Sequence, residues 1–170
     1  MEQERKVVLL AGPTASGKSA LALQLAKNLN GEIINADSMQ VYKEIVILNS
    51  RPTLHHVNIV KHHLYGFRSA DQKFSAGHWL KMAIGKIKEQ WNRDKTPIIV
   101  GGTGLYFKAL TDGLAEIPDI PDDLTNETRK LHKKIGQKKF YNKLILLDPL
   151  VKKFLLSSDS QRSMRAYEVK

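Results

Sequence analysis

The segment that most restricts how this 170-residue chain can fold is a glycine-rich run near its N-terminus. It reads Gly12-Pro13-Thr14-Ala15-Ser16-Gly17-Lys18-Ser19 and matches the pattern G-x-x-x-x-G-K-[ST] in full. The apolar, β-branched residues 6–11 predict a buried strand before it, and apolar residues at helical spacing predict a helix over residues 19–29 after it. Because strand, loop and helix form the context that this pattern requires, the segment predicts a P-loop that binds a phosphorylated ligand.

Each part of the predicted P-loop has a chemical role. Its glycines allow backbone N–H groups to point at phosphate oxygens, and the start of the following helix adds partial positive charge. Lys18 is expected to neutralise terminal phosphate oxygens, and Ser19 is expected to hold a magnesium ion. All eight residues from Gly12 to Ser19 are therefore candidate diphosphate- or nucleotide-binding residues, and the alternative is a chance glycine-rich turn.

Beyond the loop, predicted strands alternate with predicted helices. Residues 32–36 and 96–100 read as strands, whereas residues 75–93 and the segment from residue 105 read as helices. This alternation predicts an α/β fold: a P-loop NTPase-like parallel sheet flanked by helices, with a small helical insert. We predict a core domain over residues 1–115, a basic helical insert over 116–158 in which only 144–147 could form a strand, and the start of a returning core helix over 159–170.

Two further polar positions follow predicted strands. Asp37 comes directly after strand 32–36, and a carboxylate at that end of a strand can accept a proton or orient magnesium. The alternative for Asp37 is a helix cap. Thr103 lies in the glycine-rich turn after strand 96–100, from which its hydroxyl is expected to reach the same crevice; an ordinary strand-to-helix turn is the alternative.

Composition narrows the class of protein. The 27 lysines and arginines against 17 acidic residues give a net charge of +10, which favours polyanionic partners. Nine of the basic residues fall between Arg129 and Lys153, so this stretch is either a solvated helix face or a surface that contacts a phosphate backbone. Without a leader pattern, a long apolar run or any cysteine, we expect a soluble cytoplasmic protein with no membrane association, no disulfides and no thiolate metal site.

Four histidines, at positions 55, 56, 62 and 63, raise the question of a metal centre. Each pair is adjacent in the sequence, and adjacent residues of a strand point to opposite faces of the sheet. We therefore expect no histidine metal centre.

Taken together, the ordered blocks of this sequence resemble those of the tRNA dimethylallyltransferase family, also called tRNA isopentenyltransferases. The resemblance spans essentially the whole chain. The blocks are Gly12–Ser19, Asp37-Ser38-Met39-Gln40-Val41-Tyr42-Lys43, His62-His63-Leu64, residues 100–110, Asp148-Pro149, Asp159, Gln161-Arg162 and Arg165-Ala166-Tyr167-Glu168-Val169.

This resemblance implies that a dimethylallyl group moves from dimethylallyl diphosphate to the exocyclic amine of the adenosine just 3′ of a tRNA anticodon. The implied partners are dimethylallyl diphosphate and the anticodon stem-loop of tRNA, with Mg2+ as cofactor. The implied catalytic residues are Asp37, as proton acceptor, Thr103 and Lys18, and Thr14 would bind the diphosphate with Lys18. The implied tRNA-binding residues are Asp37, Ser38, Met39, Gln40, Gln161, Arg162, Ser163, Met164 and Arg165.

The chain also departs from the family pattern. Family chains continue well beyond the position of Lys170, with an arginine that contacts the diphosphate, so we expect a truncated, monomeric chain that is inactive alone or complemented by a separate C-terminal fragment. Residues 45–52 lack the acidic and threonine positions of the family, and Lys61 replaces a proline. Two other functions remain open: a small-molecule P-loop kinase that uses ATP and magnesium, and a non-catalytic RNA-binding remnant.

Overall fold

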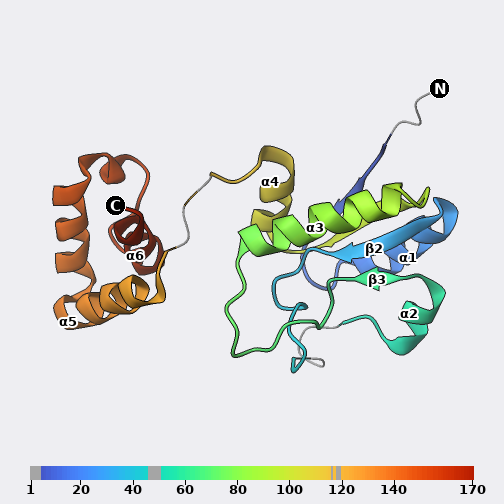
Figure 1. Cartoon of the computed structure of the whole chain (residues 1–170), viewed down its shortest axis with the longest axis horizontal. Helices are drawn as coiled ribbons and strands as arrows, with labels where there is room; N and C mark the ends of the chain where they lie inside the picture. Colours follow the sequence, from blue (N-terminus) through green and yellow to red (C-terminus); the bar gives the residue numbers. More distant parts are fainter. Residues whose placement is uncertain (1–4, 46–50, 116, 118–119) are drawn as a thin grey trace. The chain divides into compact units, whose positions relative to one another are not determined.

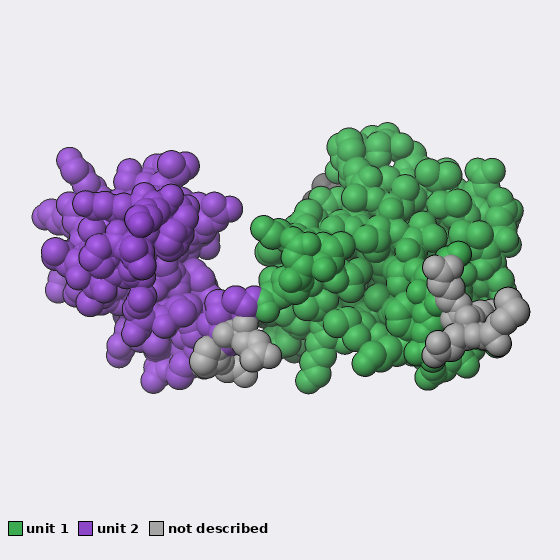
Figure 2. Space-filling view, turned by 90° about the horizontal axis from the view of Figure 1, so that it is seen from above, with its two compact units in different colours: residues 1–114 green, residues 115–170 purple. Residues whose placement is uncertain are grey.

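The computed structural model describes residues 5–45, 51–115, 117 and 120–170. The chain divides into two compact units, residues 1–114 and residues 115–170, coloured green and purple in Figure 2. The predicted boundaries after residue 115 and after residue 158 stay predictions. Among the described residues, no helix has both the length and the apolar character needed to cross a membrane.

The first unit is a parallel sheet with helices on both faces (Figure 1). The described strands pair in the order β1-β4-β2-β3, and every pairing is parallel. This arrangement confirms the predicted α/β fold. The elements in chain order are β1 (Val8–Ala11), α1 (Lys18–Asn28), β2 (Gly31–Asn35), α2 (Leu54–Ile59), β3 (His62–His63), α3 (Ala76–Trp91), β4 (Thr96–Gly101) and α4 (Gly104–Asp112).

The two central strands supply residues to two separate layers of core. Ile34 and Ile99 pack with Trp79 of α3 on one face of the sheet. Their neighbours Ile33 and Ile98 pack with residues of α1 on the other face. Because alternate residues of a strand point to opposite faces, and both faces are covered, consecutive apolar residues at the middle of each central strand are buried.

The end of β4 lies unusually close to the end of β2. A Cβ atom added to Gly101 would lie 2.1 Å from backbone atoms of Ala36, so position 101 accepts only glycine without a backbone shift. The backbone contact is reinforced by two hydrogen bonds, from the N–H of Ala36 to the carbonyl of Val100 at 2.7 Å and from the N–H of Thr103 to the carbonyl of Ala36 at 3.1 Å. The loops that follow β2 and β4 therefore leave the sheet side by side.

The second unit is helical. It contains α5 (Asp122–Leu147), the short 3-10 helix η1 (Pro149–Lys153) and α6 (Ser160–Val169), and α5 is kinked at Gly136, where φ is 76°. Tyr141 and Leu144 of α5 pack with Val151, with Leu155 and with residues of α6. The interpretation of residues 144–147 as a strand is wrong: they form the last turn of α5, in which Leu144 is buried whereas Leu146 and Leu147 are exposed.

Candidate active site

The candidate site lies where the parallel strands of the first unit end. The P-loop follows β1, Asp37 follows β2, Tyr65 follows β3, and Gly102 and Thr103 follow β4. The carboxyl ends of parallel strands share one edge of a sheet, which is where ligands bind in open α/β folds. The fold thus brings together polar residues that lie up to 91 positions apart in the sequence, from Gly12 to Thr103.

The P-loop has the backbone of an anion-binding turn. Ala15 and Gly17 both have positive φ, 62° and 80°, so the chain reverses tightly before α1 begins at Lys18. Gly17 is the N-cap of α1 and offers no side chain to the first N–H groups of the helix. Those N–H groups are the donors that a phosphate accepts at a helix N-terminus.

The ammonium group of Lys18 lies over this loop. It donates to the carbonyl oxygen of Pro13 and, at 3.3 Å, to the hydroxyl of Ser16. A lysine held by neutral oxygens of the loop can exchange these bonds for stronger bonds to an anion. The predicted role of Lys18 as a phosphate ligand therefore requires only a local movement of its flexible side chain.

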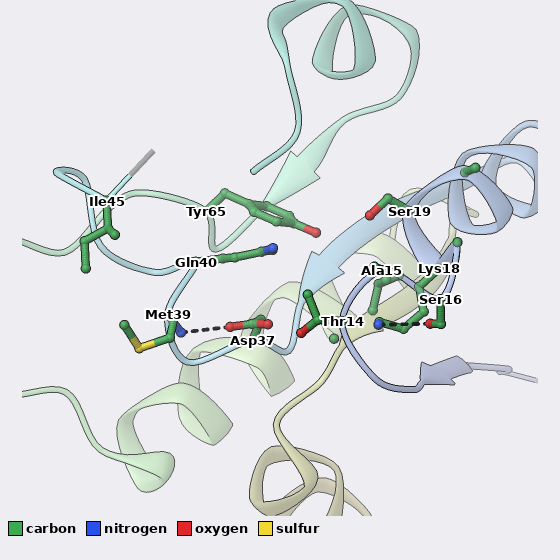
Figure 3. Close-up of a pocket in the computed structure, with 14 residues that line it drawn as sticks. Thr14, Ala15, Ser16, Lys18, Ser19, Asp37, Met39, Gln40, Ile45 and Tyr65 are labelled. Carbon is green, nitrogen blue, oxygen red and sulfur yellow. Dashed lines mark hydrogen bonds between the residues drawn. The ribbon is translucent and has the colours of Figure 1, made fainter. Parts of the chain in front are cut away.

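A cavity of about 590 Å³ opens between the P-loop and the loop after β2 (Figure 3). Its volume is within the range of small-molecule sites. Gly12, Pro13, Ser38 and Thr103 are not among the described lining residues. The cavity is lined by Thr14, Ala15, Ser16, Gly17, Lys18, Ser19, Ala20, Asp37, Met39, Gln40, Ile45, Tyr65, Val100 and Gly101.

Asp37 presents its carboxylate from a turn rather than from a helix cap. One carboxylate oxygen, Oδ1, accepts the N–H of Met39 at 2.9 Å, as aspartates do when they close a turn two residues long. The residue is half-buried and lines the cavity. Hence the carboxylate has a fixed direction and access to a ligand, which a proton acceptor needs.

Asn35 holds the loop of Asp37 in place, a role that sequence reasoning did not detect. Its fully buried side-chain amide donates to the carbonyls of Asp37 at 2.9 Å and Leu64 at 3.0 Å, while Oδ1 accepts the N–H of Asp37 at 2.9 Å. The indole N–H of Trp79 in turn donates to the backbone carbonyl of Asn35 at 2.7 Å. One side chain therefore links the loops that follow β2 and β3.

Thr103 links the loop after β4 to the same region. Its hydroxyl accepts the N–H of Ser38 at 2.9 Å and donates to the hydroxyl of Ser38 at 3.3 Å. The predicted catalytic Thr103 is thus next to Asp37 in space, bonded to the residue that follows it. These bonds also orient Ser38.

The charge of Asp37 contributes to the raised pKa values of two tyrosines, Tyr65 and Tyr106. Burial raises the pKa of Tyr106 to about 12, with further contributions from Tyr42 and Asp37. Burial also raises the pKa of Tyr65, and Asp37 adds to that rise. Both phenols are therefore protonated at any physiological pH, and either can act only as a neutral hydrogen-bond partner.

The four histidines have structural surroundings. His55 and His56 lie in α2, so the premise that this pair belongs to a strand is wrong; Thr53 accepts the N–H of His56 and begins a helix there. His62 shares a hydrogen bond of 2.6 Å between Nδ1 and the carbonyl of Val60, and burial lowers the pKa of this imidazole. His63 belongs to the ion-paired cluster described next.

A buried carboxylate lies at the opposite end of β2 from the cavity. Glu32 contacts His63 Nε2 at 2.6 Å and both terminal nitrogens of Arg93 at 2.9 and 3.0 Å. Burial alone would raise the pKa of Glu32, but the hydrogen bonds and charges of Arg93 and His63 outweigh it, so this pKa is lowered. The cluster ties β2, β3 and the segment after α3 together.

The remaining predicted tRNA-binding residues lie on α6 in the second unit. Asp159 caps this helix by accepting the N–H of Arg162 at 3.0 Å. Ser163 is fully buried, and its hydroxyl donates to the carbonyl of Asp159 and accepts from Gln137. Gln161, Arg162 and Arg165 are exposed and Met164 is half-buried, so these four are the ones available for an RNA contact.

Parts of two predicted features lie outside the described residues. Most of the divergent segment 45–52 falls at residues 46–50, and the proline-rich start of the insert includes residues 116, 118 and 119.

Comparison with known proteins gives one consistent result. The family model described as IPP transferase matches residues 40–170. Among curated relatives, the tRNA dimethylallyltransferase of Pelagibacter ubique is 53% identical over 170 residues, covering 100% of this chain and 54% of the relative. That of Rickettsia massiliae is 49% identical over 167 residues, covering 98% and 46%. Both alignments include the P-loop and Asp37, although the chain spans about half the length of the curated relatives it matches.

Solved structures agree. A full-length tRNA isopentenylpyrophosphate transferase from Bacillus halodurans is 33% identical with a TM-score of 0.64, over 98% of this chain and 55% of that one. A eukaryotic dimethylallyltransferase acting on tRNA is 31% identical with a TM-score of 0.80, over 95% and 40%. Since the family model matches most of the chain and these relatives align with nearly all of it, the chain belongs to the IPP transferase family.

Proposed function

We propose that this chain carries the reaction site of an enzyme that transfers a dimethylallyl group from dimethylallyl diphosphate to the exocyclic amine of the adenosine 3′ of a tRNA anticodon. The observation that carries the proposal is that a P-loop and the carboxylate of Asp37 border one cavity of about 590 Å³. An anion site and a proton acceptor facing one space are what this transfer requires. Membership of the IPP transferase family and the names of the relatives support the same reaction.

The residues divide the chemistry between leaving group and nucleophile. The amine nitrogen bonds to the allylic carbon as the bond between that carbon and the diphosphate oxygen breaks, and the diphosphate departs with the electron pair. Lys18, Thr14 and the N–H groups at the start of α1 stabilise the charge that develops on the diphosphate. Asp37 accepts the proton that the amine loses, which leaves the product neutral at nitrogen.

Other residues near Asp37 would receive the target base. Met39 and Gln40 line the cavity, and Ser38 is fixed next to them by Thr103. An adenine must leave its stack to reach this depth, at a cost of a few kcal/mol. We assign Ser38, Met39 and Gln40 to the pocket of the extruded base, and Thr103 to the orientation of this pocket.

The oxygen ligands in the cavity fit a magnesium ion. Ser19 and Asp37 both line it, and Mg2+ is commonly held by one or two protein oxygens together with phosphate oxygens of a substrate. When bound there, the ion would offset negative charge on the diphosphate. Ser19 is the residue that would hold it, so that the carboxylate of Asp37 stays free to accept the proton.

The second unit would supply contacts to the tRNA backbone. Its sequence between Arg129 and Lys153 contains nine basic residues, and Arg162 exposes 77% of its side chain on α6. Such cations bind phosphates without reading bases, and they make affinity salt-dependent. We propose that the protein is a monomer. We also propose that turnover requires residues from the half of the relatives that this chain does not match, on the same or on a separate polypeptide.

Binding to this chain tests the ligand assignment directly. Isothermal titration calorimetry is expected to show that dimethylallyl diphosphate binds and that Lys18→Met weakens this binding at least tenfold. ATP binding tighter than dimethylallyl diphosphate, with phosphoryl transfer, would instead identify a small-molecule kinase.

Turnover is best measured with the non-matching half of the Pelagibacter ubique relative added to the chain. Mass spectrometry of an adenosine-containing anticodon stem-loop should then detect one added dimethylallyl group. Asp37→Ala should abolish the product while salt-sensitive RNA binding persists. RNA binding without product for the unmodified chain, under conditions where the full-length relative works, would favour a non-catalytic RNA-binding remnant.

A further inference from the structure

Tyr65 is a cavity residue to which neither the P-loop motif nor the family pattern assigns a role. It follows β3, the shortest described strand, and reaches the same sheet edge as Asp37 and the P-loop. Leu64 before it has a positive φ of 62°, and its carbonyl is held by the amide of Asn35. This local geometry turns the chain at the end of β3 and directs the Tyr65 ring into the cavity.

The ring of Tyr65 is fixed on its inner side. It packs against the apolar cluster under α1 that includes Ile33 and Ile98. The ring of His62 meets it edge-on, with centroids 5.6 Å apart and an interplanar angle of 66°. His62 is itself bonded through Nδ1 to the carbonyl of Val60. A ring held in this way loses little further freedom when its hydroxyl binds a ligand.

The hydroxyl of Tyr65 faces the P-loop. In Figure 3 it points from its strand end toward the side of the cavity formed by Thr14 and Ser19, next to the amide of Gln40. Tyr65 and Ser19 also line together a small second cavity of about 10 Å³, so the two residues are neighbours. Tyr65 therefore lies beside the start of α1, where phosphate charge collects.

The hydroxyl of Tyr65 is available to a ligand in the cavity. Among the described residues, none forms a hydrogen bond with it. Its pKa is raised by burial and by the charge of Asp37, so it remains a donor across the physiological range. A hydroxyl that lines the cavity can donate to a ligand there, and an anionic oxygen accepts a stronger hydrogen bond than a neutral oxygen does.

We propose that Tyr65 is a diphosphate-binding residue: its hydroxyl donates a hydrogen bond to an oxygen of the diphosphate held by the P-loop. The identity of the ligand rests on the proposed function, whereas the donor role rests on the geometry of the cavity. Tyr65 would thereby add a neutral donor opposite Lys18. A hydrogen bond to a charged group is strong enough that its removal should reduce affinity about tenfold or more.

The test uses the whole chain and inorganic pyrophosphate as the probe. Calorimetric titration should show pyrophosphate binding about tenfold weaker for Tyr65→Phe, which removes only the hydroxyl. Tyr167→Phe is the matched control, because it removes a phenol hydroxyl from the second unit, and it should leave the affinity unchanged. Urea unfolding followed by tryptophan fluorescence should give the same midpoint for Tyr65→Phe and the unmodified chain, which shows that the variant is folded.

The outcomes separate this inference from the proposed function. Equal affinities for the Tyr65→Phe variant and the unmodified chain, with binding still lost in Lys18→Met, would overturn the role of Tyr65 and leave the P-loop assignment intact. Failure of the unmodified chain to bind pyrophosphate would overturn both. If Tyr65→Phe spared pyrophosphate but weakened binding of an adenosine-containing stem-loop, the hydroxyl would face the base and the inference would be wrong.

Discussion

Replacing Asn35 with alanine is expected to destabilise the first unit by about 3 kcal/mol. The side chain is fully buried and makes three hydrogen bonds of 2.9 to 3.0 Å to main-chain groups of Asp37 and Leu64. Each such bond contributes about 1 kcal/mol net, and its loss leaves a buried main-chain group unsatisfied. Because native domains are stable by only about 5 to 15 kcal/mol, this loss is a large part of the total.

Tryptophan fluorescence in urea measures this change in the first unit alone. The chain has two tryptophans, Trp79 and Trp91, and both lie on α3. Unfolding of the second unit therefore does not enter the signal. Asn58→Ala is the matched control, since Asn58 is exposed on α2, and it should change the free energy of unfolding by no more than about 0.5 kcal/mol.

A second substitution separates hydrogen bonding from lost volume. Asn35→Asp keeps the shape of the side chain and the oxygen that accepts the Asp37 N–H. It replaces the NH2 group, which donates to two backbone carbonyls, with a buried carboxylate oxygen. At pH 7, Asn35→Asp should lower the free energy of unfolding more than Asn35→Ala does. Acidification should restore part of this loss, because burial favours the neutral form of the acid. A loss below about 1 kcal/mol for Asn35→Ala, or a milder effect of aspartate, would refute the reasoning.

Three further outcomes are expected. Gly101→Ala should lower the urea midpoint, because its Cβ would lie 2.1 Å from the Ala36 backbone, whereas Gly85→Ala, with no atom within 4 Å, should leave it equal or raise it. Burial alone would raise the pKa of Glu32, but its ion pairs lower this pKa in the folded chain. The stability that the ion pairs provide is therefore present above the unfolded pKa of 4.5 and is lost as the pH falls. Between pH 7 and pH 3, the urea midpoint of Glu32→Gln should fall less than the urea midpoint of the unmodified chain. Leu9 is 42% exposed on β1, an edge strand of the described sheet, and should cause weak self-association of the monomer only at high protein concentration; sedimentation velocity at that concentration should show less of it for Leu9→Lys, and unchanged association would place the contact elsewhere.

The parts of the site that could be predicted from the sequence are those with local signals. The P-loop is contiguous, and its glycines, lysine and flanking periodicities all lie within 24 residues, from Lys6 to Leu29. Asp37 could be predicted for a related reason, because a carboxylate after an apolar run marks the end of a strand. These signals require no knowledge of which strands are neighbours.

The parts that could not be predicted depend on contacts between distant segments. Asn35 reads as an ordinary strand residue, and its role appears only when Leu64, 29 positions away, lies beside it. Tyr65 follows a strand of two residues, too short to give any periodicity. The adjacency of His55 and His56 carries no period and so does not distinguish a strand from a helix, whereas the Thr53 cap favours a helix.

The order of the strands decides what kind of ligand the cavity can bring into reaction. β4 lies between β1 and β2, so the two strands that lead to the P-loop and to Asp37 are two strand spacings apart, or about 10 Å. Gly102 follows the middle strand, and a Cβ there would lie 3.4 Å from the carbonyl oxygen of Gly12 and 3.7 Å from Asp37 Oδ2. The space between anion site and proton acceptor is therefore kept free of side chains. A ligand that holds its phosphates in the P-loop can extend over this glycine and place a carbon, rather than a phosphorus, within reach of a nucleophile that donates its proton to Asp37.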